Sequence, residues 1–185
     1  MKPSRSSFLT ALLCMAGIAG SLTRQAEAGA SEAPARIELS DQHDKPQVIT
    51  FPAKQVTIIS LADREGREQS NLWAPTLAAY KDRAAIYAIA DAKGTPGFMK
   101  NSIRRRIEAA QKKPLLIDWS GAVCASIGYQ PKAANLVIIA PGGAILHRIS
   151  GPPTPGNVKA LPPLSNAPSP ARSDRRRSSQ RPGLA

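Results

Sequence analysis

Sulfur and histidine are scarce in this sequence, and their scarcity excludes several kinds of site. The 185 residues include two cysteines, Cys14 and Cys124, and two histidines, His43 and His147. Structural zinc sites need closely spaced cysteine and histidine ligands, and this chain has no such spacing. A glycine-rich phosphate-binding loop is also missing. We therefore expect no metal site and no bound cofactor.

The start of the chain has the pattern of a secretory signal. A short basic segment precedes an apolar run at residues 8–20, and Ala26 and Ala28 supply the small residues that signal peptidase requires. At 1.5 Å per residue this run spans about 20 Å, less than the ~30 Å of a bilayer core, which disfavours a retained anchor. We expect residues 1–28 to be a signal peptide and 29–35 a linker, and the mature protein to be periplasmic or secreted.

Exported proteins are often stabilised by disulfides, but the cysteines of this chain leave packing as the source of stability. Cys14 lies inside the expected leader and follows Leu13, whereas a lipidation site requires a small residue there. The mature chain then keeps one cysteine, Cys124, and can form no internal disulfide.

Positive charge dominates the chain, but much of it lies outside the expected domain. The formal net charge is +12, and residues 29–165 contain 17 basic and 11 acidic residues. This moderate excess does not indicate a nucleic-acid-binding protein. Two basic clusters stand out, Arg104 to Arg106 and the tail arginines 172, 175, 176, 177 and 181. The cluster at 104–106 could bind an anionic lipid or an acidic partner, with a solvated helix face as the alternative. The tail cluster could contact an anionic membrane surface, with an inert extension as the alternative.

Alternating strand-like and helix-like segments fill residues 36–161 and predict a single α/β domain. The run 56–61 is apolar on both faces and predicts a strand in the middle of a sheet. A helix is expected from Ser70 or Asn71 to about Asp82, with Trp73, Leu77 and Tyr80 buried. A second helix is expected over 98–112, with Ile103, Ile107 and Ala110 facing inward.

The end of the expected domain has its own signals. Residues 136–149 predict a hairpin in which His147 alternates with Ile145 and Ile149, and we expect the three to share one face. Thr154 and Pro155 predict the start of a last short helix. Residues 162–185, rich in proline, serine and arginine, are expected to be a disordered basic tail.

The order of these segments resembles the thioredoxin-like fold in its redoxin and peroxiredoxin variety. Several strings carry the resemblance: residues 37–42, Asp91 after a strand, 118–129, and 135–139 followed by Gly142 and Gly143. The resemblance implies a three-layer α/β fold with a central mixed sheet.

The catalytic cysteines of that family are missing from this chain. Catalytic members hold a reactive cysteine at the junction of the central strand and the first helix, and the matching residues 61–70 contain none. Disulfide exchange requires a sulfur nucleophile, so dithiol and thiol-peroxidase chemistry is excluded at this position. The proline that thioredoxins place before the hairpin is also absent from residues 133–135.

The same junction supplies the candidate binding residues, which are Asp63, Arg64, Glu65, Arg67, Glu68 and Ser70. They occupy the functional edge of the fold and could contact a protein or a small ligand; a solvated loop is the alternative. Cys124, among small and apolar neighbours, is expected to be a buried small hydrophobe. Three hypotheses follow: a binding protein without redox activity, a one-cysteine redoxin using Cys124, and a basic adaptor at the envelope surface.

Overall fold

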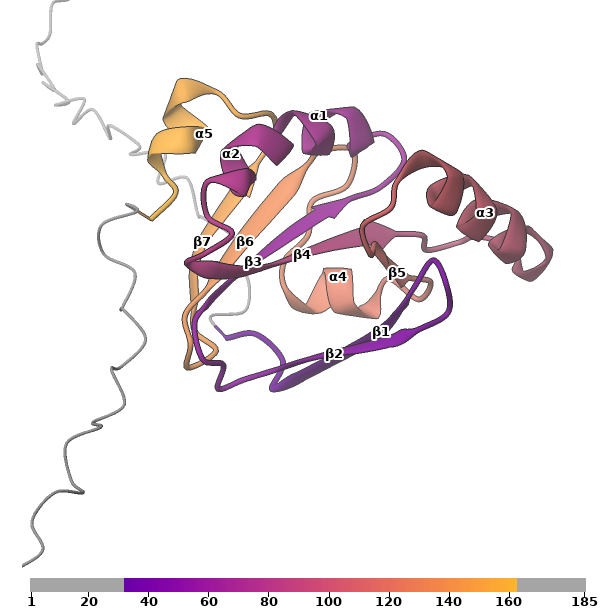
Figure 1. Ribbon diagram of the computed structural model, residues 1–185, viewed down its shortest axis with the longest axis horizontal. Helices are drawn as coiled ribbons and strands as arrows, with labels where there is room; N and C mark the ends of the chain where they lie inside the picture. Colours follow the sequence, from indigo (N-terminus) through magenta and orange to yellow (C-terminus); the bar gives the residue numbers. More distant parts are fainter. Residues whose placement is uncertain (1–31, 163–185) are drawn as a thin grey trace, which may run out of the picture.

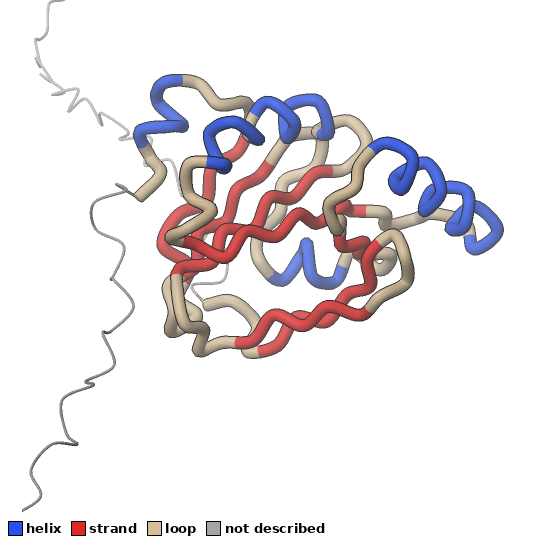
Figure 2. Tube along the Cα trace, viewed as in Figure 1, coloured by secondary structure: helices blue, strands red, loops and turns tan. Residues whose placement is uncertain are grey.

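The most apolar run of the chain forms the central strand β3 (Val56–Ala62) of a seven-stranded mixed sheet (Figures 1 and 2). The computed structural model describes residues 32–162, so the expected signal peptide, part of the linker and nearly all of the tail lie outside it. The sheet order is β2-β1-β5-β4-β3-β6-β7. The remaining strands are β1 (Arg36–Asp41), β2 (Pro46–Thr50), β4 (Ala84–Asp91), β5 (Leu116–Asp118), β6 (Asn135–Ile139) and β7 (Ile145–Ser150).

Strand β3 confirms the expectation of a strand buried on both faces. It pairs in parallel with β4 and antiparallel with β6, and β4 pairs in parallel with β5. Successive side chains of a strand point to opposite faces. Ile58 therefore joins the cluster around Trp73, whereas Ile59 packs into a second cluster on the other face. The sheet thus separates two hydrophobic cores.

Three short helices cover the first face of the sheet: α1 (Arg67–Leu72), α2 (Ala74–Ala78) and α5 (Pro155–Lys159) (Figure 1). Trp73 is fully buried there, and its Nε1 donates to the Gly151 carbonyl at 2.9 Å. Leu77 is buried, and Tyr80 packs against the same cluster and donates its hydroxyl to the Pro162 carbonyl at 3.1 Å. The expected apolar stripe is confirmed.

The expected single helix from Ser70 to Asp82 is wrong. The helix begins earlier, at Arg67, and a break at Trp73 separates α1 from α2. Pro75 explains the break, because proline has no amide proton for an intrahelical bond and its ring clashes with the carbonyl four residues before it.

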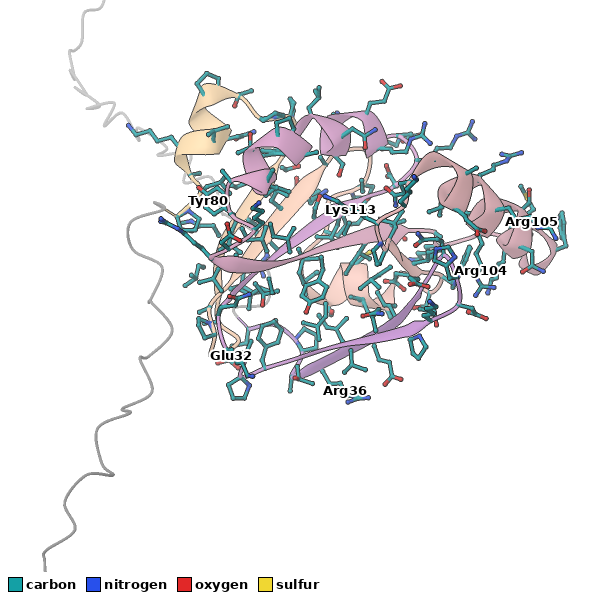
Figure 3. All side chains as sticks on the ribbon, viewed as in Figure 1. Glu32, Arg36, Tyr80, Arg104, Arg105 and Lys113 are labelled. Atoms are coloured by element: carbon teal, nitrogen blue, oxygen red, sulfur yellow. The ribbon has the colours of Figure 1, made fainter. Side chains whose placement is uncertain are left out.

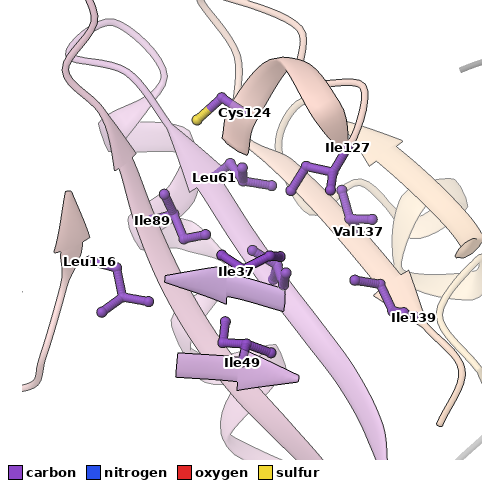
Figure 4. Close-up of a cluster of buried hydrophobic side chains, with 10 residues drawn as sticks. Ile37, Ile49, Leu61, Ile89, Leu116, Cys124, Ile127, Val137 and Ile139 are labelled. Carbon is purple, nitrogen blue, oxygen red and sulfur yellow. The ribbon is translucent and has the colours of Figure 1, made fainter. Parts of the chain in front are cut away.

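The second face of the sheet is covered by α4 (Ala122–Ser126) and by the hairpin of β1 and β2, which curls over the central strands (Figure 4). Ile37 and Ile49 of the hairpin belong to the same buried cluster as Ile59 and Cys124. The first layer therefore consists of α1, α2 and α5, and the second of the strands β5, β4, β3, β6 and β7. The third consists of α4 and the β1–β2 end of the sheet, which folds over the central strands.

The crossover from β4 to β5 lies at one end of the molecule (Figure 1). It contains a 3-10 turn, η1 (Gly97–Met99), and α3 (Lys100–Ala110), and no residue of either is buried. Ile103 and Ile107 are half-buried as expected, but Ala110 is exposed, contrary to expectation. Among residues 32–162 no helix has the length and apolar character needed to cross a membrane.

Candidate functional site

Asp63, the residue that follows β3, organises the junction between β3 and α1. Its Oδ1 accepts hydrogen bonds from the backbone N–H groups of Glu65 at 2.9 Å and Gly66 at 2.7 Å. Its Oδ2 accepts from the N–H of Lys132 at 2.7 Å. One carboxylate therefore closes its own turn and fastens it to the loop before β6.

The surroundings keep this carboxylate ionised. Partial burial opposes the charge, but the N–H donors of Gly66, Lys132 and Glu65 outweigh it and hold the pKa of Asp63 below its usual value. The buried hydroxyl of Tyr129 lies near the same carboxylate without a hydrogen bond of ordinary geometry. Burial and the negative charge of Asp63 raise the pKa of Tyr129, so this hydroxyl stays protonated.

Close packing makes this junction rigid. A Cβ atom at Gly66 would lie 2.5 Å from the carbonyl carbon of Ala133 and 3.0 Å from the amide nitrogen of Ala134. Such distances exclude every residue except glycine unless the backbone moves. Gln69 adds a second tie, because its Oε1 accepts from the N–H of Ala134 at 3.3 Å.

The structure divides the six candidate residues into two groups. Asp63 and Ser70 are half-buried and bonded internally; the Ser70 hydroxyl lies 3.1 Å from that of Ser60 on β3. The other four are exposed, alternate in sign, and are called the charged turn from here on: Arg64, Glu65, Arg67 and Glu68. Among the described residues, none of these four side chains has an ion pair or hydrogen-bond partner.

Cys124 lies beneath the same edge of the sheet, although it is far from the junction in sequence. It belongs to the buried cluster that includes Leu61, near the end of β3 (Figure 4). Its side chain is 1% exposed, which confirms the expected burial. Burial, followed by the negative charges of Asp118 and Asp91, raises the pKa of the Cys124 thiol. The thiol is therefore un-ionised at neutral pH, and the thiolate is the reactive form.

Asp118 is the second buried carboxylate of the site. It is fully buried and accepts from the N–H groups of Gly121 at 2.8 Å and Cys124 at 2.9 Å, and from the Ser120 hydroxyl at 2.8 Å. Burial opposes its charge, but the donors, led by the Cys124 N–H, hold the pKa of Asp118 below its usual value. This carboxylate anchors the start of α4.

A repeated pattern links these carboxylates, and our sequence reasoning missed it. The sequence Asp-x-x-Gly occurs at 63–66, 91–94 and 118–121, each time at the carboxyl end of one of the parallel strands. In each case an Asp Oδ1 accepts from a backbone N–H two residues ahead, as in Asp91 with Lys93 at 3.0 Å. The signal is an aspartate that ends an apolar run, followed three residues later by glycine.

These aspartates hold loops and do not form a metal centre. Within residues 32–162 no group of three or more histidine, cysteine, aspartate or glutamate side chains could hold a metal ion. His43 lies 3.6 Å from Glu108, and His147 is exposed on β7.

Comparison with known proteins identifies the fold. No protein-family model and no curated protein matches the chain. Among solved structures it is similar to the pneumococcal exposed lipoprotein thioredoxin Etrx1 of Streptococcus pneumoniae, with a TM-score of 0.51 at 13% identity over 69% of this chain and 100% of that one. It is also similar to peroxiredoxin Q of Xanthomonas campestris, with a TM-score of 0.50 at 14% identity over 71% and 93% of the two chains.

A third similar structure is a protein of Chlorobium tepidum assigned to the DsbE-type thiol:disulfide interchange proteins. The TM-score is 0.52 at 12% identity, over 72% of this chain and 94% of that one. This chain therefore has a thioredoxin-like fold, and it has no cysteine at the junction of its central strand and first helix.

Proposed function

We propose that this protein is an exported thioredoxin-like domain that binds a partner through the charged turn and catalyses neither dithiol exchange nor peroxide reduction. The observation that carries the proposal is the state of the β3–α1 junction. An ionised carboxylate, Asp63, is bonded to three backbone N–H groups where a redox-active relative needs a sulfur nucleophile. A carboxylate held in this way can fix a surface but cannot exchange a disulfide.

The charged turn has the properties of a recognition surface. Its four side chains are exposed and unpaired among the described residues, and the backbone beneath them is tied down by Asp63 and Gly66. Rigid backbone lowers the entropic cost of binding. The alternating signs suit a protein partner with the complementary pattern, because charge patterning selects partners and register. A small ligand is the second class of partner that this turn could recognise.

Export rests on the leader sequence. The expected signal peptide at residues 1–28 would deliver the domain to the periplasm or the exterior. One structural relative, Etrx1, is an exposed lipoprotein. Cell fractionation of the full chain, with and without residues 8–20, tests the location; recovery of both forms in the cytosol would contradict it.

Turnover assays test the absence of redox chemistry. The purified exported chain should neither reduce insulin disulfides in the presence of dithiothreitol nor consume hydrogen peroxide above the rate of the buffer. A thioredoxin and a peroxiredoxin serve as positive controls. Turnover that disappears in Cys124→Ser would overturn the proposal and establish the one-cysteine redoxin.

Thiol labelling separates the same two hypotheses by a different measurement. A Cys124 side chain that is 1% exposed should resist iodoacetamide in the native protein and react only as the protein unfolds. Labelling of the native protein at the rate of a free thiol would favour the redoxin hypothesis.

A charge swap tests the binding surface. Replacing Arg64 and Arg67 by Glu, and Glu65 and Glu68 by Arg, inverts the pattern of the charged turn while the net charge stays constant. Partner capture from periplasmic extract should be lost. The matched control exchanges Arg36 and Glu38, an exposed ion pair on β1 whose atoms lie 2.8 Å apart, and should capture normally. Equal capture by both variants would refute the role of the charged turn.

A further inference from the structure

The net positive charge of the described domain comes entirely from one segment. Residues 92–115, the crossover that contains η1 and α3, carry seven basic residues and one acidic residue, Glu108. The rest of residues 32–162 carries ten basic and ten acidic residues. The domain is therefore an electrically balanced body with a basic helix at one end (Figure 3).

Most of this charge does not stabilise the fold. Arg104 and Lys100 are the exceptions. The Arg104 Nη2 lies 2.7 Å from Asp44 Oδ1, and the Arg104 guanidinium carbon and the Lys100 Nζ lie 5.6 Å and 5.3 Å from the centre of the Trp119 ring. These contacts attach α3 to the domain. Arg105 and Arg106 are exposed, and within the described residues their side chains have no partner.

An exposed apolar tip precedes the basic helix. Phe98 is 87% exposed and Met99 is 40% exposed. Ser102, Arg105 and Ala109 recur at α-helical spacing on α3 and are all exposed, so they form one outward face, and Phe98 is exposed in the turn η1 just before it. Two adjacent apolar side chains therefore lie exposed at the start of a helix that carries exposed basic residues.

We propose that η1 and α3 form a docking surface for an anionic lipid bilayer. Phospholipid headgroups would neutralise Arg105, Arg106 and the neighbouring lysines, while Phe98 and Met99 would enter the boundary between headgroups and acyl chains. A basic face next to an exposed aromatic is the combination that holds peripheral helices at anionic membranes. An acidic protein with an apolar pocket is the alternative partner, and it predicts no binding to protein-free vesicles. The surface uses different residues from the charged turn and is independent of it.

Vesicle binding by the full exported chain tests the proposal. Phosphatidylcholine vesicles with and without a third of phosphatidylglycerol are sedimented with the protein. Binding should require the anionic lipid and weaken as salt rises past about 0.15 M, where the screening length is about 8 Å. Arg105→Gln/Arg106→Gln should lower the affinity about 25-fold, since each basic residue near the surface contributes about fivefold.

The matched control is Lys81→Gln/Arg83→Gln, which removes the same charge from two exposed residues before β4. Its affinity should stay within about twofold of the wild type, because charges beyond the screening length contribute little. Both variants keep every tail arginine, so the tail affects them equally. Similar losses in the two variants would mean that net charge alone drives binding, and would overturn the proposal.

Phe98 provides an independent readout. Phe98→Ser should weaken binding about tenfold while the salt dependence remains, because the lost contribution is hydrophobic. Phe98→Trp should gain a blue-shifted fluorescence component on anionic vesicles that is absent from the wild type. Unchanged affinity in Phe98→Ser and unshifted emission in Phe98→Trp would refute insertion. Absence of binding to anionic vesicles would refute the whole proposal.

Discussion

Gly66→Ala should destabilise the protein by forcing apart two loops that the junction holds together. Alanine usually stabilises a protein when it replaces glycine in an unstrained backbone, by about 0.4–1 kcal/mol, because it restricts the unfolded chain. Here the new Cβ would lie 2.5 Å from the carbonyl carbon of Ala133. Carbon atoms prefer about 3.5–4.0 Å, so the loop before β6 must move by about 1 Å.

The structure sets the size of this effect. A shift of that size would stretch the Asp63 Oδ2 to Lys132 N bond from 2.7 Å, and the Gln69 Oε1 to Ala134 N bond from 3.3 Å, beyond hydrogen-bond range. Overpacking costs about 1–3 kcal/mol, and a hydrogen bond to a charged group about 1.5–3 kcal/mol. After the gain in the unfolded state is subtracted, the net loss is about 1.5–5.5 kcal/mol.

Urea unfolding followed by tryptophan fluorescence measures this loss as a lower midpoint at constant slope. The control is Gly97→Ala, where an added Cβ has no atom within 4 Å, and its stability should stay within about 1 kcal/mol of the wild type. If Gly66→Ala unfolds at the same urea concentration as Gly97→Ala, or at a higher one, the close packing of the two loops is refuted.

Three further predictions concern buried polar groups. Asp118→Asn should lose about 2–4 kcal/mol by urea unfolding, because an amide cannot accept the Gly121 and Cys124 N–H bonds with both of its atoms; exposed Asp82→Asn is the control. The pKa values of Asp63 and Asp118 are lowered in the folded state, so their contribution is complete above about pH 5 and lost as pH falls below about 4. Acid unfolding curves should show this loss, and it should be smaller in Asp63→Asn/Asp118→Asn; an equal acid slope in that variant would contradict the assignment. Burial raises the pKa of Cys124 above its ordinary 9.0, so stability should fall above about pH 9, where the unfolded thiol alone ionises, and Cys124→Ala should flatten the alkaline limb.

Two elements, the strand β3 and the start of α5, could be predicted from the residues that form them. The run at 56–61 is apolar on both faces and became the central strand β3. Thr154 and Pro155 were expected to start a helix, and Thr154 Oγ1 indeed accepts from the Asn157 N–H at 3.2 Å at the start of α5. The cap at Thr154 lies three residues from its partner, whereas β3 pairs with β4 and β6, which are distant in sequence; it could be predicted because burial on both faces requires a continuous apolar run.

The hairpin shows where local patterns fail. Alternation predicted that Ile145, His147 and Ile149 share one face. The register changes between Ile138, which pairs with His147, and Ile139, which pairs with Ile145. This irregularity turns Ile145 toward the cluster with Ile139, whereas Ile149 packs with Trp73, and His147 is exposed. A bulge depends on the partner strand, so period-two counting along one strand cannot reveal it.

The sequence located the candidate site but did not distinguish its half-buried residues from its exposed ones. Residue type alone marked Asp63 and Ser70 as surface groups like Arg64. Their partners, Lys132 and Ser60, come from another loop and from the strand itself, and only the folded sheet brings them together. The same long-range packing brought Cys124 into the cluster of Leu61, which the distance in sequence had concealed.

The bond from Asp63 to the Lys132 amide couples two segments that are 69 residues apart. A molecule bound to the charged turn would oppose the transient opening of that bond, so it would slow deuterium uptake at an amide it never touches. By reciprocity, anything that loosens the loop before β6 would weaken recognition at the turn by the same free energy. Binding at the charged turn would then change the backbone dynamics of both the turn and the loop before β6, without any movement of the sheet itself.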